Sequence, residues 1–103
     1  MVTFVNRFEV SGPVAEFERA FEATSDFFRA QPGFVSHRML RHLDRPGHYV
    51  NLAEWRDVDS FRKAVGHPDF EPHARILRAL ATSAPGLYTP FLERTAAEPE
   101  SLG

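Results

Sequence analysis

Apolar and polar residues alternate along residues 2–10, and this alternation predicts the first β-strand of the chain. One face of this strand carries Val2, Phe4, Asn6, Phe8 and Val10, and the other carries Thr3, Val5, Arg7 and Glu9. Asn6 therefore lies on the apolar face. A buried amide needs a hydrogen-bond partner, so we expect Asn6 to bond to a protein group, a water molecule or a ligand.

A helix is predicted after Ser11-Gly12, with Pro13 in its first turn, where a missing amide hydrogen costs nothing. Residues suited to burial then recur every three or four positions, at Val14, Phe17, Phe21, Thr24 and Phe28. This spacing predicts one buried stripe along the helix. Residues 31–33, Gln-Pro-Gly, end it.

Residues 34–43 and 48–56 predict two further strands, and the sequence Asp-Arg-Pro-Gly at residues 44–47 predicts the turn of a hairpin between them. In the second of these strands one face carries Tyr49, Asn51, Ala53 and Trp55. The opposite face carries Val50, Leu52, Glu54 and Arg56. The hairpin thus places a second asparagine on an apolar face.

The C-terminal half predicts two helical segments and a last strand. Asp57 is expected to cap a short helix, and after a break at residues 66–68 Asp69 is expected to cap a second one over residues 70–82. The apolar stripe of this second helix consists of Phe70, His73, Leu77 and Leu80. Residues 84–86 are expected to end that helix, and residues 87–92 to form a strand whose Pro90 lies at an edge or a bulge.

The element order is therefore β-α-β-β-α-β, which predicts an α+β protein with a ferredoxin-like fold, the helices covering one face of an antiparallel sheet. The other face carries Val5, Val50 and Leu52, and we expect a second copy of the chain to cover it in a homodimer. We expect one domain over residues 1–94 and a flexible C-terminal tail over residues 95–103, which are small or acidic.

Composition excludes several functions. With 12 basic and 14 acidic residues the net charge is −2, so we expect neither nucleic acid nor a membrane surface as a partner. The chain has no cysteine, which excludes disulfides, thiolate metal sites and cysteine nucleophiles. The start of the sequence has no signal-peptide pattern, and we expect a cytoplasmic protein.

Three residues on the inward strand faces are candidates for chemistry: Asn6, Asn51 and Trp55. Each has a polar group that must find a protein, water or ligand partner. A purely structural role, in which the amides tie down loops and the indole fills volume, is the alternative. His73 and His67 are further candidates for a pocket wall, whereas His37, His42 and His48 receive no role.

The sequence lacks other familiar catalytic signals. It has no nucleophile elbow, no phosphate-binding glycine loop and no dinucleotide fingerprint. No metal site is expected, because His67 and His73 lie six residues apart across a break without a convergent carboxylate. A redox function would therefore depend on a bound haem or flavin, or on the substrate itself.

Four segments carry a resemblance to a known family: FVNRFEV, QPGFVSHRML, YVNLAEW and SFRKAVGHPDFEPHARIL. Over about residues 2–92 the chain resembles the antibiotic biosynthesis monooxygenases, and FVNRF with YVN-x-x-x-W is closer to the anthrone-type monooxygenases of aromatic polyketide pathways. The resemblance implies a dimeric α/β barrel. It also implies a cofactor-independent oxidation, in which dioxygen converts a polycyclic phenolic polyketide intermediate to a quinone.

The resemblance also implies roles for residues of this sequence. Asn6 and Asn51 would hydrogen-bond the oxygens of the substrate or of the peroxide, and Trp55 would line the reaction centre. The pocket that binds the flat aromatic substrate would be formed by Phe4, Phe8, Phe17, Phe21, Phe28, Met39, Tyr49, His73 and Leu77. Asparagine is a poor general base, so a substrate phenolate, a water or His73 would accept the proton.

Two alternatives remain open at this point. Haem-degrading members of the same superfamily share the asparagine of the first strand, but they carry a tryptophan where this chain has Ala64 and the axial histidine where it has Ala74. His73 is one position away from the axial site. A non-catalytic module that binds a small ligand is the other alternative, since fold alone does not determine function.

Overall fold

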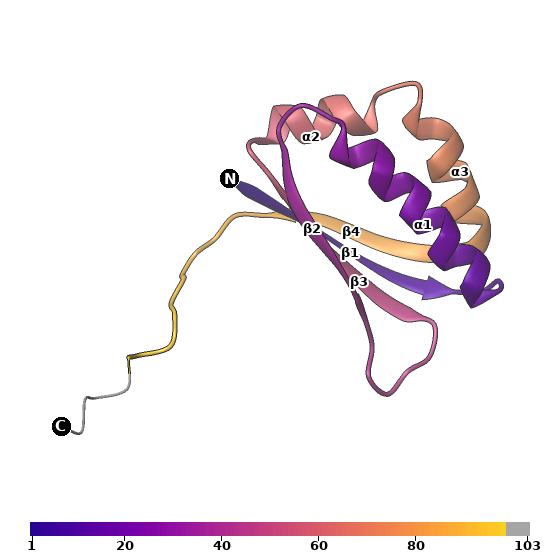
Figure 1. Cartoon of the computed structure of the whole chain (residues 1–103), viewed down its shortest axis with the longest axis horizontal. Helices are drawn as coiled ribbons and strands as arrows, with labels where there is room; N and C mark the ends of the chain where they lie inside the picture. Colours follow the sequence, from indigo (N-terminus) through magenta and orange to yellow (C-terminus); the bar gives the residue numbers. More distant parts are fainter. Residues whose placement is uncertain (99–103) are drawn as a thin grey trace.

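The computed structural model describes residues 1–98. Along the chain the elements are β1 (Val2–Val10), α1 (Val14–Arg29), β2 (Phe34–Arg41), β3 (His48–Trp55), α2 (Val58–Val65), α3 (Phe70–Leu80) and β4 (Ala81–Tyr88). The four strands of this described part form one antiparallel sheet in the order β2-β3-β1-β4 (Figure 1). The predicted ferredoxin-like α+β fold is confirmed.

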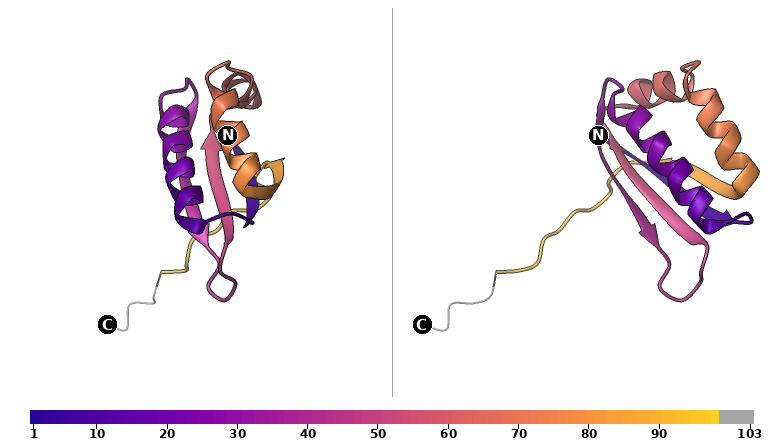
Figure 2. Two further views of the ribbon diagram at one scale, coloured as in Figure 1. Left: turned by 90° about the vertical axis from the view of Figure 1, so that its right-hand side faces the viewer. Right: turned by 45° about the vertical axis from the view of Figure 1, so that its right-hand side comes forward.

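All three helices of the described part lie on one face of the sheet (Figures 1 and 2). The inward faces of the two central strands, β1 and β3, are those that the alternation predicts. In β3 every second residue is buried, at Tyr49, Asn51, Ala53 and Trp55. No helix long and apolar enough to cross a membrane occurs in residues 1–98.

Within residues 1–98 the core consists of two apolar clusters at different positions along the central strands. The first contains Phe8, Phe17, Phe21, Tyr49, Leu77 and Ala81. The second contains Val2, Ala53, Trp55, Phe61 and Ala64. Asn6 and Asn51 are register partners in β1 and β3 and lie between the two clusters along these strands. The sheet therefore places a layer of two amides between two apolar layers.

The last strand differs from the prediction. It spans Ala81–Tyr88, where the sequence analysis expected residues 87–92, and α3 ends at Leu80. The backbone N–H groups of Ser11 and Gly12 donate to the carbonyl oxygen of Leu80 at 2.8 and 3.1 Å and so cap the helix end. The chain passes directly into β4, and Pro85 is tolerated there because β4 is an edge strand.

Two predictions about the helices are also corrected. Asp57 caps α2 as expected, accepting a 2.8 Å hydrogen bond from the Ser60 amide, but the Asp69 side chain makes no capping hydrogen bond to α3. The first turn of α1 leaves Val14 exposed, and the buried residues of α3 are Ala74 and Leu77. His73 is therefore at the border of the α3 stripe.

A β-bulge in β2 changes which residues of that strand face inward. Phe34 pairs with Trp55 and Ser36 with Glu54, so Val35 is an extra residue between them. Beyond the bulge His37 pairs with Ala53, which faces inward. Phe34 and His37 thus both face the helices although they are three residues apart.

The sheet face away from the helices carries Val5, Val50 and Leu52, as predicted, and each is half-buried. Residues 89–98 follow β4 without regular secondary structure. The expected flexible tail over residues 95–103 falls partly on residues 99–103, which lie outside the described part of the chain.

Candidate functional site

Asn51 and Trp55 line the same internal cavity, which lies between the sheet and the helices α1 and α2. Its volume is about 20 Å³, room for about one water molecule. The lining is mostly aromatic and comprises Phe4, Phe21, Ser25, Phe28, Phe34, His37, Asn51, Ala53, Trp55 and Phe61. Ala53 separates Asn51 from Trp55 on the same strand face, and its small side chain leaves space between the amide and the indole.

Trp55 is held in place by aromatic side chains. Its ring meets Phe28, Phe34 and Phe61 edge-on, with centroid distances of 5.8, 5.3 and 5.8 Å. Its indole Nε1 is buried and has no hydrogen-bond partner within residues 1–98. An unsatisfied buried donor costs roughly 1 to 3 kcal/mol, so a ligand that accepts this hydrogen bond would recover that cost.

Asn51 belongs to a hydrogen-bonded chain that crosses from β3 through β2 to α1. Its Oδ1 lies 3.2 Å from Nδ1 of His37, and Nε2 of His37 lies 2.6 Å from Oγ of Ser25. All three residues line the 20 Å³ cavity. The site thus contains a polar chain within an apolar surrounding, where hydrogen bonds are electrostatically stronger than in water.

Asn6 lies next to Asn51 in the sheet but lines a different hollow. This hollow of about 100 Å³ is formed by Asn6, Phe8, Phe70, Ala74, Leu77, Arg78, Ala81 and Ser83. The Oδ1 atom of Asn6 is buried and has no hydrogen-bond partner in the described part of the chain. The structure therefore brings Asn51 and Trp55 together and places Asn6 one strand away, with an unused acceptor.

A wider groove opens between α1 and the hairpin β2–β3. It has a volume of about 440 Å³, within the usual range of small-molecule pockets, and is lined by Phe17, Glu18, Phe21, Glu22, Met39, Leu40, Arg41 and Tyr49. Phe21 lines both this groove and the inner cavity. One aromatic ring thus stands between the open groove and the space beside Asn51.

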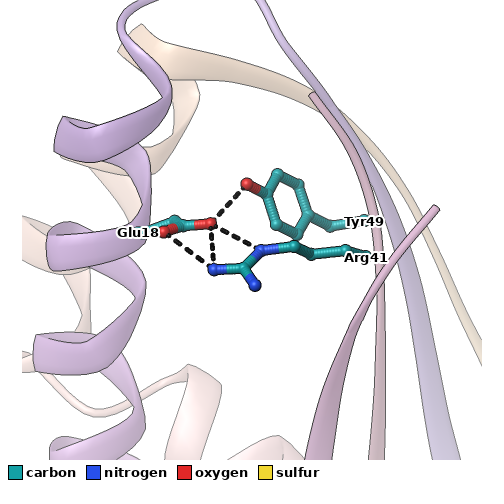
Figure 3. Close-up of polar contacts among 3 residues, drawn as sticks. All are labelled: Glu18, Arg41 and Tyr49. Carbon is teal, nitrogen blue, oxygen red and sulfur yellow. Dashed lines mark hydrogen bonds and ion pairs between the residues drawn. The ribbon is translucent and has the colours of Figure 1, made fainter. Parts of the chain in front are cut away.

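Three polar side chains cross this groove from α1 to the hairpin (Figure 3). The Arg41 guanidinium donates to both carboxylate oxygens of Glu18, from Nε at 3.0 Å and Nη2 at 3.2 Å, and the Tyr49 hydroxyl donates to Glu18 Oε2 at 2.6 Å. The bonds from Arg41 and then from Tyr49 hold the pKa of the Glu18 carboxyl below its usual value. Burial, and then the bond to Glu18, raises the pKa of Tyr49.

The predicted pocket residues divide among these spaces. Phe4, Phe21 and Phe28 line the inner cavity, and Phe17, Phe21, Met39 and Tyr49 line the groove. Phe8 and Leu77 line the hollow beside Asn6.

His73 is absent from the described residues that line these three spaces, and so is His67. Both rings pack against Phe27 instead, at centroid distances of 5.7 and 5.6 Å. The His73 ring thus packs toward α1, and a role for it in the substrate pocket stays a prediction. No group of three or more metal-binding side chains occurs in residues 1–98.

Sequence reasoning missed four residues of this region: Glu18, Ser25, His37 and Arg41. His37 received no role, although it contacts Asn51 directly. Strict alternation from Phe34 would place His37 on the outer face, and the bulge reverses this. No pattern in the sequence signals that bulge.

Comparison with known proteins gives a consistent result. The sequence profile of a family described as "Antibiotic biosynthesis monooxygenase" matches residues 1–75. The deoxynogalonate monooxygenase of Streptomyces nogalater is 57% identical over 88 residues, which cover 85% of this chain and 75% of that protein.

Solved structures extend this result. The crystal structure of SnoaB, a cofactor-independent oxygenase from Streptomyces nogalater, superposes with a TM-score of 0.86 at 52% identity, covering 95% of this chain and 97% of that one. A monooxygenase-like protein from Caulobacter crescentus matches with a TM-score of 0.76 at 22% identity, covering 89% of this chain and 90% of that one. The latter similarity shows the fold alone.

Proposed function

Because this chain belongs to the antibiotic biosynthesis monooxygenase family, we propose that it oxidises a polycyclic phenolic polyketide intermediate to a quinone with dioxygen. The reaction class, a cofactor-independent oxygenation, follows from relatives that are more than half identical over most of the chain. The observation within the structure that supports the proposal is that Asn51 and Trp55 face one aromatic-lined cavity.

The reaction can be written without a cofactor because the substrate supplies the electrons. An anthrone-type methylene loses a proton and becomes a carbanion stabilised by the fused rings. The carbanion passes one electron to dioxygen, and the resulting radical pair combines to a peroxide anion, which takes up the proton released in the first step and becomes a hydroperoxide. Loss of water then leaves the carbonyl of the quinone, so that one oxygen atom enters the product and the other leaves as water.

The protein must stabilise negative charge, first on the carbanion and its conjugated oxygen and then on the peroxide. Asn51 and Trp55 are suited to this because an amide and an indole N–H in a small, aromatic-lined cavity stabilise an oxyanion more strongly than in water. Asn6 lines the separate hollow on the neighbouring strand and is given no part in this step. An amide does not accept the proton effectively, so a phenolate of the substrate or a water molecule takes it.

Fused rings need more space than the 20 Å³ beside Asn51. The adjoining groove of about 440 Å³ has the volume for them, its walls combine aromatic and charged side chains, and Phe21 lines both spaces. We therefore propose that the substrate enters along the groove between α1 and the hairpin and that Phe21 moves aside as its reacting ring passes inward.

The direct test is dioxygen uptake with an anthrone such as dithranol, with and without protein. Wild-type protein is expected to accelerate oxidation, and Asn51→Ala and Trp55→Phe are expected to reduce kcat by about 10²-fold for a lost oxyanion donor. Circular dichroism would check that the variants remain folded. An unchanged rate of autoxidation for several anthrones would rule out the proposed function, and variants that lose stability but not turnover would favour a non-catalytic module.

Haem degradation is a weaker candidate for this chain. The position of the axial histidine is Ala74, which is buried at 8% exposure, and the position of the family tryptophan is Ala64, which is 1% exposed. His73 packs on Phe27 instead of facing the cavity. A titration with haemin is expected to give no sharp Soret band.

We also propose that the active form is a cytoplasmic homodimer. Val5, Val50 and Leu52 lie on the sheet face opposite the helices, and a second copy related by two-fold symmetry would bury them. The cytoplasmic location rests on the cysteine-free composition. Sedimentation should show a dimer at micromolar concentration, and Leu52→Arg should shift it to monomer. A wild-type monomer would contradict the proposal.

A further inference from the structure

His37 connects three elements at the wall of the cavity, and none of the steps proposed above uses it. The residue lies on β2, its Nε2 is 2.6 Å from Oγ of Ser25 on α1, and its Nδ1 is 3.2 Å from Oδ1 of Asn51 on β3. Its ring also packs against Phe21 and Phe34, at centroid distances of 5.9 and 6.0 Å. Two hydrogen bonds and two aromatic contacts therefore fix its orientation.

The direction of the two hydrogen bonds follows from the groups involved. An amide oxygen can only accept, so Nδ1 of His37 carries a hydrogen and donates it to Asn51. In the neutral ring Nε2 then has a lone pair and accepts from the Ser25 hydroxyl, which can donate. The contacts thus select a single tautomer of the imidazole.

This arrangement determines which end of the Asn51 amide remains for a ligand. Its oxygen is occupied by His37, and among residues 1–98 no hydrogen bond is made by its Nδ2 group. An amide on an alkyl side chain can otherwise turn by 180° and present either its oxygen or its NH₂ group. With the oxygen fixed by His37, Asn51 presents a donor, which is what an oxyanion requires.

We propose that His37, anchored by Ser25, is a positioning residue that holds the Asn51 amide with its donor directed into the substrate cavity. The inference rests on the proposed function for its catalytic consequence. Both ring nitrogens are already hydrogen-bonded to protein groups, so the geometry gives His37 an orienting role and not that of the proton acceptor.

A double-mutant cycle on kcat tests the proposal. His37→Phe keeps an aromatic ring but removes the donor, and we expect kcat to fall about tenfold, equivalent to about 1.4 kcal/mol, with KM little changed. His37→Asn should recover most of the rate, because its amide nitrogen can approach the position of Nδ1. In the background of Asn51→Ala, His37→Phe should cause no further loss. Independent, multiplying losses would overturn the proposal.

His48→Phe provides the matched control, since it makes the same change at another half-buried histidine, one that received no role and packs on the ring of His42. We expect it to leave kcat unchanged. A comparable loss at both positions would mean that His37→Phe acts through the fold in general, which would also contradict a positioning role.

A measurement that needs no turnover separates this inference from the proposed function. Nitrogen-15 NMR of the imidazole should show the Nδ1-protonated tautomer for His37 in wild-type protein, and Asn51→Ala should abolish that preference. An Nε2-protonated ring in the wild type would refute the positioning role even in an active enzyme. If anthrones are not oxidised, the proposed function fails, whereas the tautomer still decides whether His37 orients Asn51.

Discussion

Asn6 and Asn51 are directly opposite each other in the antiparallel pair of β1 and β3, yet they differ in how they are satisfied. Oδ1 of Asn51 accepts a hydrogen bond from His37, whereas Oδ1 of Asn6 is buried without a partner in the described residues. The Asn51 side chain therefore bonds to another side chain of the protein, whereas the Asn6 side chain keeps an unused acceptor.

This difference predicts opposite effects of one substitution on stability. Asn6→Leu removes an unsatisfied buried acceptor and is expected to leave the free energy of unfolding unchanged or raise it by up to about 1 kcal/mol. Asn51→Leu leaves the Nδ1–H donor of His37 without its acceptor and is expected to lower the free energy of unfolding by about 1 to 3 kcal/mol. Urea unfolding measures both. Equal destabilisation by the two substitutions would show that Asn6 has a partner in solution.

The shifted pKa values of Glu18 and Tyr49 predict that the stability of the fold depends on pH. The folded protein lowers the pKa of Glu18 from its ordinary value of 4.5, so the stability that the ionised carboxylate contributes is present above pH 4.5 and is lost as the pH falls through the lowered pKa. The thermal midpoint of Glu18→Gln should thus be below that of wild type near pH 7, and the gap should close on acidification below pH 4.5. A gap that stays constant with pH would contradict this.

Tyr49 acts at the other end of the pH range. Its folded pKa is raised above 10.0, so the stability it contributes is present below pH 10.0 and is lost as the pH rises through the raised value. Tyr49→Phe should lower the thermal midpoint near pH 7, since the hydrogen bond to Glu18 is gone. Its difference from wild type should shrink in strong alkali, and thermal scans over pH 7 to 11 would measure this.

Gly33 and Gly47 share the same unusual backbone conformation but differ in the space around them, so alanine substitutions at the two positions can be compared. Both have a positive φ, 85° and 81°. A Cβ at Gly33 would overlap the Ser60 side chain, whereas one at Gly47 would meet only ordinary contacts with Val10 at 3.7 Å. Gly47→Ala is therefore expected to cost the backbone strain alone, about 1 to 2 kcal/mol, and Gly33→Ala clearly more. Similar losses in urea unfolding would argue against the close approach to Ser60.

The position of Phe21, which lines both the groove and the inner cavity, predicts that its side chain limits the size of the substrate. Phe21→Leu should lower KM for anthrones with additional fused rings more than for dithranol, at a stability cost of about 1 to 3 kcal/mol. Phe17→Leu is the control, since Phe17 lines the groove but not the inner cavity. Equal changes in both variants would place the entry route elsewhere.

The sequence predicted the inward faces of the two central strands correctly. Alternation with a period of two is a local property of an extended backbone, so the sequence alone sufficed to assign Asn6, Asn51 and Trp55 to the helix-covered side. The cap of α2 by Asp57 is equally local, since donor and acceptor are three residues apart.

The boundary between α3 and β4 could not be predicted in the same way. Leu80 ends the helix because the amides of Ser11 and Gly12, about seventy residues earlier in the chain, reach its carbonyl oxygen. The proline and glycine at residues 85 and 86 indicated a loop, but pairing with β1 makes them part of an edge strand. Contacts distant in sequence thus outweighed local propensity.

The sequence by itself determined the fold class and the apolar face on which the two amides and the indole lie, because local periodicity encodes both. Only the tertiary structure decided how these groups are paired. One extra residue in β2 turns His37 inward to meet Asn51, and the packing of α1 supplies Ser25 behind it. The physical reason is that hydrogen-bond partners from three separate elements are selected by how those elements pack together, which no single stretch of sequence specifies.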